Sequence, residues 1–257
     1  MNQKKFLFTG GSGLLGSEFK KNLPDIIIPR STEFDVTNYE QMEAFIKEKE
    51  IETIFHAAAF TSPPKVDLEP IKGLEVNIIG TSNVVKLCAK YGIKLIYVCT
   101  DYVFKGDQGN YKEDDSVFPV NKYAWSKLGG ECAVRMYDNH LIIRTSFGPN
   151  VFPYEKAFTD QWTSRLSVGQ VVPKMIELIE SGATGTYHVG AQRRTVFEYA
   201  KSLDAQKEIK ELSTSEVNFT VPKDTSLDCA KFEKLISDRQ HQSIGEQGVK
   251  ETSTINK

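Results

Sequence analysis

The sequence predicts an α/β fold, with a doubly wound parallel sheet and a small C-terminal cap that binds substrate. Short apolar runs of strand length alternate with helical segments through residue 148, which is typical of a parallel sheet with right-handed crossovers. The first of these runs leads directly into a glycine-rich turn. Residues 149–236 depart from the alternation and are expected to form the cap, interleaved with the main domain. The polar residues 237–257 are expected to form a flexible tail.

The amino-acid composition indicates which kinds of partner the protein can bind. The chain has 257 residues, 40% of them hydrophobic, so it can bury a full core. A net charge of −2 with interspersed Lys and Glu gives no basic stripe, so neither nucleic acid nor a membrane surface is an expected partner. The four cysteines show no metal-ligand spacing, and no apolar segment has the length of a signal peptide or membrane span. We expect a cytoplasmic protein that binds a small molecule and no metal.

The glycine-rich turn joins a short strand, Lys5–Thr9, to a helix over Ser17–Leu23. Its glycines stand three residues apart, which allows a tight turn, close approach of backbone to a pyrophosphate, and close packing of the helix on the strand. The turn therefore predicts a Rossmann-like, dinucleotide-binding domain over residues 1–148. The expected contacts in this turn are Gly10, Ser12, Gly13, Leu14, Leu15 and Gly16.

The end of the second strand, Asp25–Pro29, bears on the choice of cofactor. Arg30 and Ser31 follow it, and they suit a ribose 2′-phosphate better than a free hydroxyl. This favours NADPH, with NADH as the alternative because acidic side chains, Asp35 among them, lie close by. Asp35 and Val36 are expected beside the adenine.

Two helices and a turn of small residues complete the first half of the chain. A capping box at Thr37–Glu40 predicts a helix to about Glu50. The third strand ends in Ala57, Ala58 and Ala59, whose small side chains would let a flat cofactor lie against the backbone, while His56 is expected to be a core residue. A rigid break at Ser62–Pro64 precedes a long helix to Tyr91. The candidate contacts in this region are Ala57, Ala58, Ala59 and Asn77 for the cofactor and Thr61 for the substrate.

The end of the fourth predicted strand is expected to carry the catalytic residues. The buried run Ile93–Cys99 places Thr100 at a carboxyl strand end, where open α/β sheets bind their ligands. A helix starting near Asn121 carries Tyr123 and Lys127 one turn apart on one face, a pair that also occurs by chance on amphipathic helices. Lys127 is expected to lower the pKa of Tyr123 so that the phenol can transfer a proton to a carbonyl oxygen, with Thr100 aligning that oxygen.

The cap contributes a candidate substrate cluster. After a strand at His140–Ser146 come short helices, a further strand at Thr186–Val189, and a helix capped by Thr195 and Glu198. The expected ligand-facing side chains are Asp160, Gln161, Trp162 and Arg165, although Trp162 would also suit a core position.

Six segments together resemble the extended short-chain dehydrogenase/reductase superfamily, and within it the dTDP-4-dehydrorhamnose reductase family. They are Thr9–Gly16, Ala57–Ala59, Cys99–Gly106, Tyr123–Glu131, Arg144–Gly148 and Pro222–Asp228. The resemblance implies reduction by NADPH or NADH of a 4-keto nucleotide sugar, in deoxysugar and cell-surface polysaccharide biosynthesis, by Thr100, Tyr123 and Lys127. Substrate contacts are then expected from Asp101, Tyr102 and Val103. The sequence leaves the oligomeric state open, with a homodimer as one option.

Three alternatives share this fold. A sugar 4,6-dehydratase is disfavoured because Tyr102 stands where such enzymes carry a Glu. A nucleotide-sugar 4-epimerase would share Tyr123 and Lys127. A non-catalytic regulatory subunit, like the β subunit of methionine adenosyltransferase, resembles the same reductase family. The segment 147–159 is shorter than is usual in that family, so we expect a reshaped sugar pocket.

Overall fold

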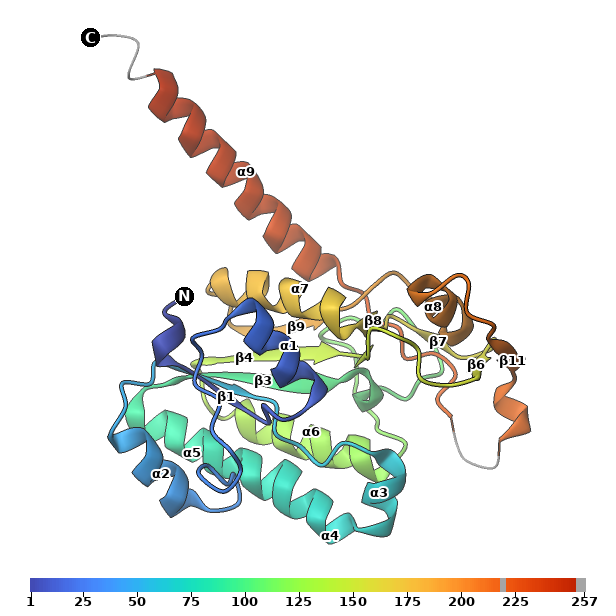
Figure 1. The fold of residues 1–257 in the computed structure, drawn as a ribbon, viewed down its shortest axis with the longest axis horizontal. Helices are drawn as coiled ribbons and strands as arrows, with labels where there is room; N and C mark the ends of the chain where they lie inside the picture. Colours follow the sequence, from blue (N-terminus) through green and yellow to red (C-terminus); the bar gives the residue numbers. More distant parts are fainter. Residues whose placement is uncertain (218–220, 253–257) are drawn as a thin grey trace.

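A five-stranded parallel sheet runs through the centre of the molecule, in the spatial order β1-β2-β3-β4-β9, and confirms the predicted fold class (Figure 1). The computed structural model describes the backbone of residues 1–217 and 221–252, and the side chains through His241. Ile27 pairs with one edge of β1, and β2, which follows it in the chain, pairs with the other edge. The direction in which strands are added to the sheet therefore reverses at β1. The strands are β1 (Phe6–Thr9), β2 (Thr53–His56), β3 (Lys94–Thr100), β4 (His140–Thr145) and β9 (Gly185–Val189).

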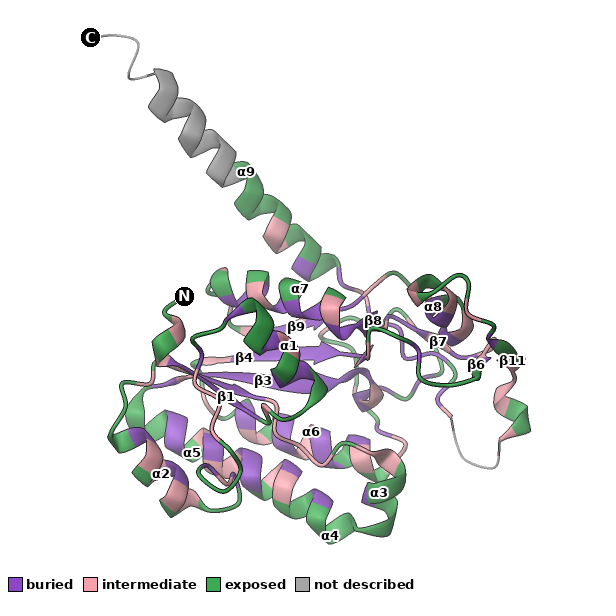
Figure 2. Ribbon diagram, in the orientation of Figure 1, coloured by how far each residue is buried: buried purple, intermediate pink, exposed green. Residues whose placement is uncertain are grey.

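Helices cover both faces of the sheet and bury two apolar layers (Figure 2). Alternate strand residues face opposite ways, so Phe8, Val98 and Ile143 join one core cluster while Leu7, Tyr97 and Ile142 join the other. The helices of the first face are α1 (Leu14–Asn22) and α7 (Val168–Glu180), and those of the second are α2 (Tyr39–Lys47), α5 (Thr81–Tyr91) and α6 (Lys122–Val134).

The second predicted strand is reduced to a single bridge between Leu7 and Ile27. Pro24 and Pro29 flank the apolar run and have no N–H to donate, which limits the ladder it can form. The helix that follows begins one residue later than predicted, because the side chain of Asn38, and not that of Thr37, accepts the hydrogen bond that caps it.

The predicted long helix before Tyr91 is divided into several pieces. Two proline-led turns, α3 (Pro63–Leu68) and α4 (Pro70–Gly73), precede a π-helical segment, η2 (Leu74–Gly80), which runs into α5. Gly80 permits close packing as expected, because a Cβ there would lie 2.8 Å from Val36 Cγ2.

The cap is built from short paired strands at the carboxyl edge of the main sheet (Figure 1). Its helix α8 (Val196–Leu203) has the predicted capping box of Thr195 and Glu198. The strand predicted at Thr186–Val189 is β9 of the main sheet, so α7 and β9 extend the main domain between two cap segments. The paired strands are β5 (Phe147–Gly148) with β8 (Leu166–Ser167), β6 (Lys156–Phe158) with β11 (Lys210–Leu212), and β7 (Trp162–Thr163) with β10 (Arg194–Thr195); the short 3-10 helices are η1 (Gln3–Lys5), η3 (Asp101–Val103) and η4 (Thr214–Glu216).

The last helix, α9 (Ala230–Thr252), starts on the main domain and points away from it (Figure 1). Phe232 is buried in the first core cluster. The helix continues through the segment expected to be a flexible tail, and residues 253–257 of that tail lie outside the described chain. No described helix is both long and apolar enough to span a membrane.

A buried ion pair ties α6 to β4. Arg144 Nη2 lies 2.7 Å from Glu131 Oε1 and Arg144 Nε lies 3.1 Å from Oε2, while Arg135 donates two further hydrogen bonds to Oε1 from the surface. Burial by itself raises the pKa of Glu131, but the hydrogen bonds and charge of Arg144 outweigh it and hold the pKa at about 2.

Replacing Glu131 with Gln should lower the free energy of unfolding by about 3 kcal/mol or more, because the buried Arg144 loses its counter-charge. Urea denaturation at pH 7 measures the change. Glu43→Gln is the matched control, since Glu43 also contacts two cations, Lys47 and Lys90, but on the surface. Equal losses in the two variants would contradict a special role for the buried pair.

Candidate active site

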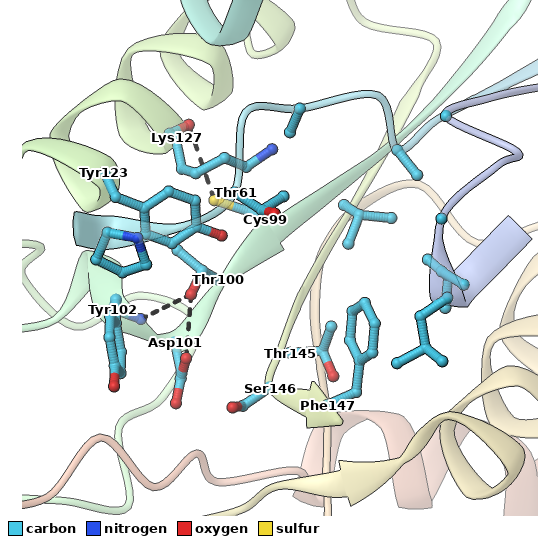
Figure 3. A pocket seen from close by; sticks show the side chains of 18 of the residues that line it. Thr61, Cys99, Thr100, Asp101, Tyr102, Tyr123, Lys127, Thr145, Ser146 and Phe147 are labelled. Carbon is cyan, nitrogen blue, oxygen red and sulfur yellow. Dashed lines mark hydrogen bonds between the residues drawn. The ribbon is translucent and has the colours of Figure 1, made fainter. Parts of the chain in front are cut away.

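A cavity of about 560 Å³ opens at the carboxyl edge of the sheet, between the glycine turn, α6 and the cap (Figure 3). It gathers residues from chain segments up to 155 positions apart, from Gly10 to Arg165. The predicted site residues that line it are Gly10, Ser12, Gly13, Leu14, Leu15, Ala57, Ala59, Thr61, Thr100, Asp101, Tyr102, Tyr123, Lys127 and Arg165.

The glycine turn has the geometry of a phosphate cradle. Gly10 has φ +76°, and a Cβ there would lie 2.7 Å from the backbone nitrogen of Ala58. A Cβ on Gly16 would lie 2.3 Å from Gly11 Cα, so both positions require glycine. The helix α1 starts at Leu14 with Gly13 as an N-cap that has no side chain, so its first N–H groups have no side-chain cap, and Leu14 and Leu15 line the cavity. These features fit the predicted dinucleotide.

The turn that carries Ala57 to Phe60 is held from behind by Asn77. Asn77 Oδ1 accepts a hydrogen bond from Phe60 N at 2.7 Å, and Nδ2 donates to Phe60 O at 3.0 Å and to Ser126 Oγ at 2.8 Å. Asn77 is fully buried and does not line the cavity. The residue predicted to touch the cofactor thus supports the turn on which the cofactor would lie.

His56 anchors the same turn as a neutral core residue. Its Nδ1 lies 2.9 Å from Thr9 Oγ1, which accepts from Ala58 N, and its Nε2 lies 3.0 Å from Thr81 Oγ1. Burial and the charge of Lys127 lower its pKa to about 3.

Tyr123 and Lys127 extend from the first two turns of α6, which Asn121 caps through a hydrogen bond from Ala124 N. Burial lowers the pKa of Lys127 to about 8, and its Nζ lies 4.2 Å from the centre of the Tyr97 ring. Burial also raises the pKa of Tyr123, with nearby Cys99 and Asp101 adding to the effect and Thr100 opposing it. The expectation that the pKa of Tyr123 lies below its ordinary value is therefore wrong for the protein alone, because desolvation outweighs the effects that favour the phenolate. Tyr123 carries its proton at neutral pH.

Thr100 ends β3 and is hydrogen-bonded to its neighbours (Figure 3). Its Oγ1 donates to Asp101 Oδ1 at 3.1 Å and accepts from Tyr102 N at 3.2 Å. The other oxygen of Asp101 accepts from Thr225 Oγ1 at 2.7 Å, which joins the predicted Pro222–Asp228 segment to the site. Burial raises the pKa of Asp101. Val103 is fully buried in the core and does not line the cavity.

The cap cluster predicted to face the ligand is divided. Arg165 lines the cavity and donates through Nε to Ser146 Oγ at 3.2 Å. Asp160 instead accepts hydrogen bonds from Ser213 and Thr214, and Gln161 Nε2 donates to Pro222 O. Trp162 packs under the Arg193 guanidinium at 3.7 Å. These three side chains hold the cap together, because their partners lie far along the chain.

The predicted adenine-side residues lie outside the cavity. Arg30 and Ser31 are exposed, Asp35 Oδ1 accepts two hydrogen bonds from Thr37, and Val36 is buried against Gly80. Ala58 and Gly16 also do not line the cavity and support the glycine turn from behind.

The cavity includes residues that the sequence analysis missed: Pro63, Val98, Cys99, Thr145, Ser146 and Phe147. Thr145 pairs with Thr100 across β3 and β4, so the strand-end argument that found Thr100 applies equally to β4. Val98 lies two residues before Thr100 on the same side of its strand.

The fold and the Tyr123–Lys127 helix define a member of the extended short-chain dehydrogenase/reductase superfamily. Residues 4–160 match the family described as the RmlD substrate binding domain, and the chain belongs to this family. It is 30% identical to a hypothetical dTDP-4-dehydrorhamnose reductase from Sulfolobus tokodaii, covering 90% of this chain and 94% of that one, with a TM-score of 0.79.

Two further relatives have different names. The dTDP-4-dehydrorhamnose reductase of Bacillus anthracis, solved in complex with NADP, is 27% identical over 91% of this chain and 92% of that one, with a TM-score of 0.81. The methionine adenosyltransferase 2 subunit beta of Rattus norvegicus is 27% identical over 90% of this chain and 82% of that protein. Similarity at this level therefore extends to reductases and to a subunit of another enzyme.

Replacing Lys127 with Met should raise the free energy of unfolding at pH 7 by up to about 3 kcal/mol, because it removes a buried group whose pKa falls from 10.5 to about 8. Below pH 8 the cost of burying the charge is fully present, and it disappears as the pH rises from 8 toward 10.5. The gain should therefore shrink between these values in denaturation curves. Lys122→Met, on the exposed face of α6, is the control. If Lys127→Met were less stable than wild type at pH 7, burial of the Lys127 charge would not be costly, and the lowered pKa of Lys127 would be contradicted.

Proposed function

We propose that the protein is an NAD(P)H-dependent reductase that converts a keto group of a nucleotide-linked sugar, at C4, to a hydroxyl. The observation that carries the proposal is that Thr100, Tyr123 and Lys127 line the same cavity as the glycine turn. Relatives named dTDP-4-dehydrorhamnose reductase support a nucleotide-sugar substrate.

The side chains divide the work of the reaction. Bound reduced nicotinamide would supply the hydride to the carbonyl carbon. Tyr123 holds its proton at neutral pH and gives it to the carbonyl oxygen, so that one hydroxyl forms and the phenolate then regains a proton from water. Lys127, one turn away, stabilises the phenolate while it lasts. Thr100 exchanges its hydrogen bond to Asp101 for one to the carbonyl oxygen and aligns it.

The cofactor we favour is NADPH. The acidic groups that could hold a free ribose hydroxyl have other partners, since Glu33 accepts from Arg30 N and Asp35 accepts from Thr37. The Arg30 side chain is exposed at the end of the second apolar run, where a 2′-phosphate would be bound.

A second candidate is a non-catalytic subunit of another enzyme. The similarity to methionine adenosyltransferase 2 subunit beta over 90% of the chain favours it. Such a subunit would bind a partner protein and leave keto sugars unchanged.

The predicted homodimer and cytoplasmic location stay predictions. Light scattering of the purified chain tests whether it forms a dimer.

Replacing Tyr123 with Phe should lower turnover by about 100-fold or more, because the proton donor is lost, while cofactor affinity stays within about twofold. The measurement follows nicotinamide absorbance with 4-keto sugars made in situ from dTDP-, GDP- and UDP-sugars. Tyr91→Phe, on the exposed end of α5, is the control. Turnover retained without the phenol would overturn the role of Tyr123. No oxidation by the wild type with any sugar, despite cofactor binding, would favour the subunit, which co-purification from a lysate then tests.

Replacing Arg30 with Ala should weaken NADPH binding about tenfold and leave NADH binding unchanged, because only NADPH has the 2′-phosphate. Fluorescence titration with both cofactors measures the ratio. Lys4→Ala, an exposed cation near the start of β1, controls for a general loss of positive charge. Equal weakening for both cofactors would contradict the assignment.

A further inference from the structure

The segment 222–228 lies between the cap and the end of β3 and is hydrogen-bonded to both. On the cap side, Trp162 N donates to Lys223 O at 2.8 Å. On the other side, Asp224 N donates to the carbonyl oxygen of Gly106, in the loop that follows β3, at 2.9 Å. A backbone that is held from both sides fixes the side chains that it carries relative to the site.

Thr225 directs one buried hydroxyl from this segment toward Asp101. Thr225 is 1% exposed, and its Oγ1 donates to Asp101 Oδ2 at 2.7 Å, across 124 positions of the chain. The other oxygen of the buried Asp101 carboxylate, Oδ1, accepts from Thr100 Oγ1 at 3.1 Å. A carboxylate that is removed from water needs hydrogen-bond donors, so the hydroxyls of Thr100 and Thr225 stabilise the same charge.

The proposed reduction requires Thr100 to release Asp101, because a single hydroxyl proton cannot be donated fully to the carboxylate and to the substrate carbonyl. When Thr100 turns to the carbonyl, Asp101 loses one donor and keeps the Thr225 hydroxyl. We propose that Thr225 is a positioning residue for the reduction, because it holds the charge of Asp101 and so frees Thr100 to align the carbonyl. The inference rests on the proposed function, since only that reaction brings a carbonyl to Thr100.

The test compares Thr225→Val, in which a methyl replaces the hydroxyl, with wild type in the reductase assay with 4-keto sugars. In this variant Thr100 is the remaining side-chain donor to Asp101 among the described residues, so kcat should fall about tenfold. KM for the sugar should stay within about twofold, because the contacts that bind the nucleotide are unchanged. Thr225→Ser should restore kcat, since it keeps the hydroxyl.

Ser226→Ala is the matched control from the same segment. Ser226 is fully buried, and its Oγ donates to Asp224 Oδ1 at 2.6 Å and accepts from Asn110 N at 2.8 Å, so its loss weakens the segment without removing a donor from Asp101. This variant should melt at a lower temperature than wild type and keep its kcat. The proposal is overturned if Thr225→Val keeps the wild-type kcat, or if Ser226→Ala loses kcat equally.

A second measurement follows the hydrogen bond in the free protein. Burial raises the pKa of Asp101, and the hydrogen bond from Thr225 is the largest effect that opposes this rise. The other groups that face Asp101 are the charge of Arg165 on the cap, the Thr100 hydroxyl, and the phenols of Tyr102 and Tyr123. An NMR titration of labelled Asp carboxyls, with the Asp101 signal identified by its loss in Asp101→Asn, should show a higher pKa of Asp101 in Thr225→Val and no change in Ser226→Ala. An unchanged pKa in Thr225→Val would overturn the proposal. Absence of turnover by the wild type with every sugar would instead reject the proposed function, and the role of Thr225 with it, even where the NMR shift is present, so the two failures are distinct.

Discussion

The buried ion pair between Arg144 and Glu131 sets the geometry on which the site depends. Glu131 lies on α6 one turn beyond Lys127, which in turn lies one turn beyond Tyr123, so fixing Glu131 fixes the face that carries all three. Arg144 lies on β4 directly before Thr145. The pair therefore fixes the position of α6 relative to β4, and these two elements form two walls of the cavity. Tyr97 reinforces it from β3 by donating its hydroxyl to Lys127 O at 2.9 Å.

A layer of side chains behind the cavity holds the loops that form its surface. Asn77 fixes the turn at Phe60, His56 and Thr9 fix it at Ala58, and Asp101 joins the end of β3 to Thr225. Each of these groups is buried and has its hydrogen bonds satisfied within the chain. A site built in this way is largely preorganised, because the supporting contacts exist before any ligand binds.

Burial gives Tyr123 and Lys127, the pair proposed to act in the reaction, their electrostatic character at a cost in stability. Desolvation keeps Tyr123 protonated and lowers the pKa of Lys127 to about 8, so at neutral pH a cation is held in a poorly solvated place. Cost of this kind is common where proteins perform chemistry, since the groups are placed for reaction rather than for folding. The buried Thr145 hydroxyl, which has no hydrogen-bond partner among the described residues, also costs stability.

The sequence by itself determined the features that depend on neighbours along the chain. These include the parallel sheet, the glycine turn before α1, the capping of α6 and α8, and the one-turn spacing of Tyr123 and Lys127. Tertiary structure alone decided which polar residues face the cavity. Asp160 and Asn77 have polar side chains of the kind that bind ligands. In the structure, however, Asp160 is hydrogen-bonded to Thr214, 54 residues away, and Asn77 to Ser126, 49 residues away. The local sequence pattern does not indicate such distant partners, because they meet only when strands and loops pack. The same packing leaves the Thr145 hydroxyl in the cavity without a hydrogen-bond partner among the described residues.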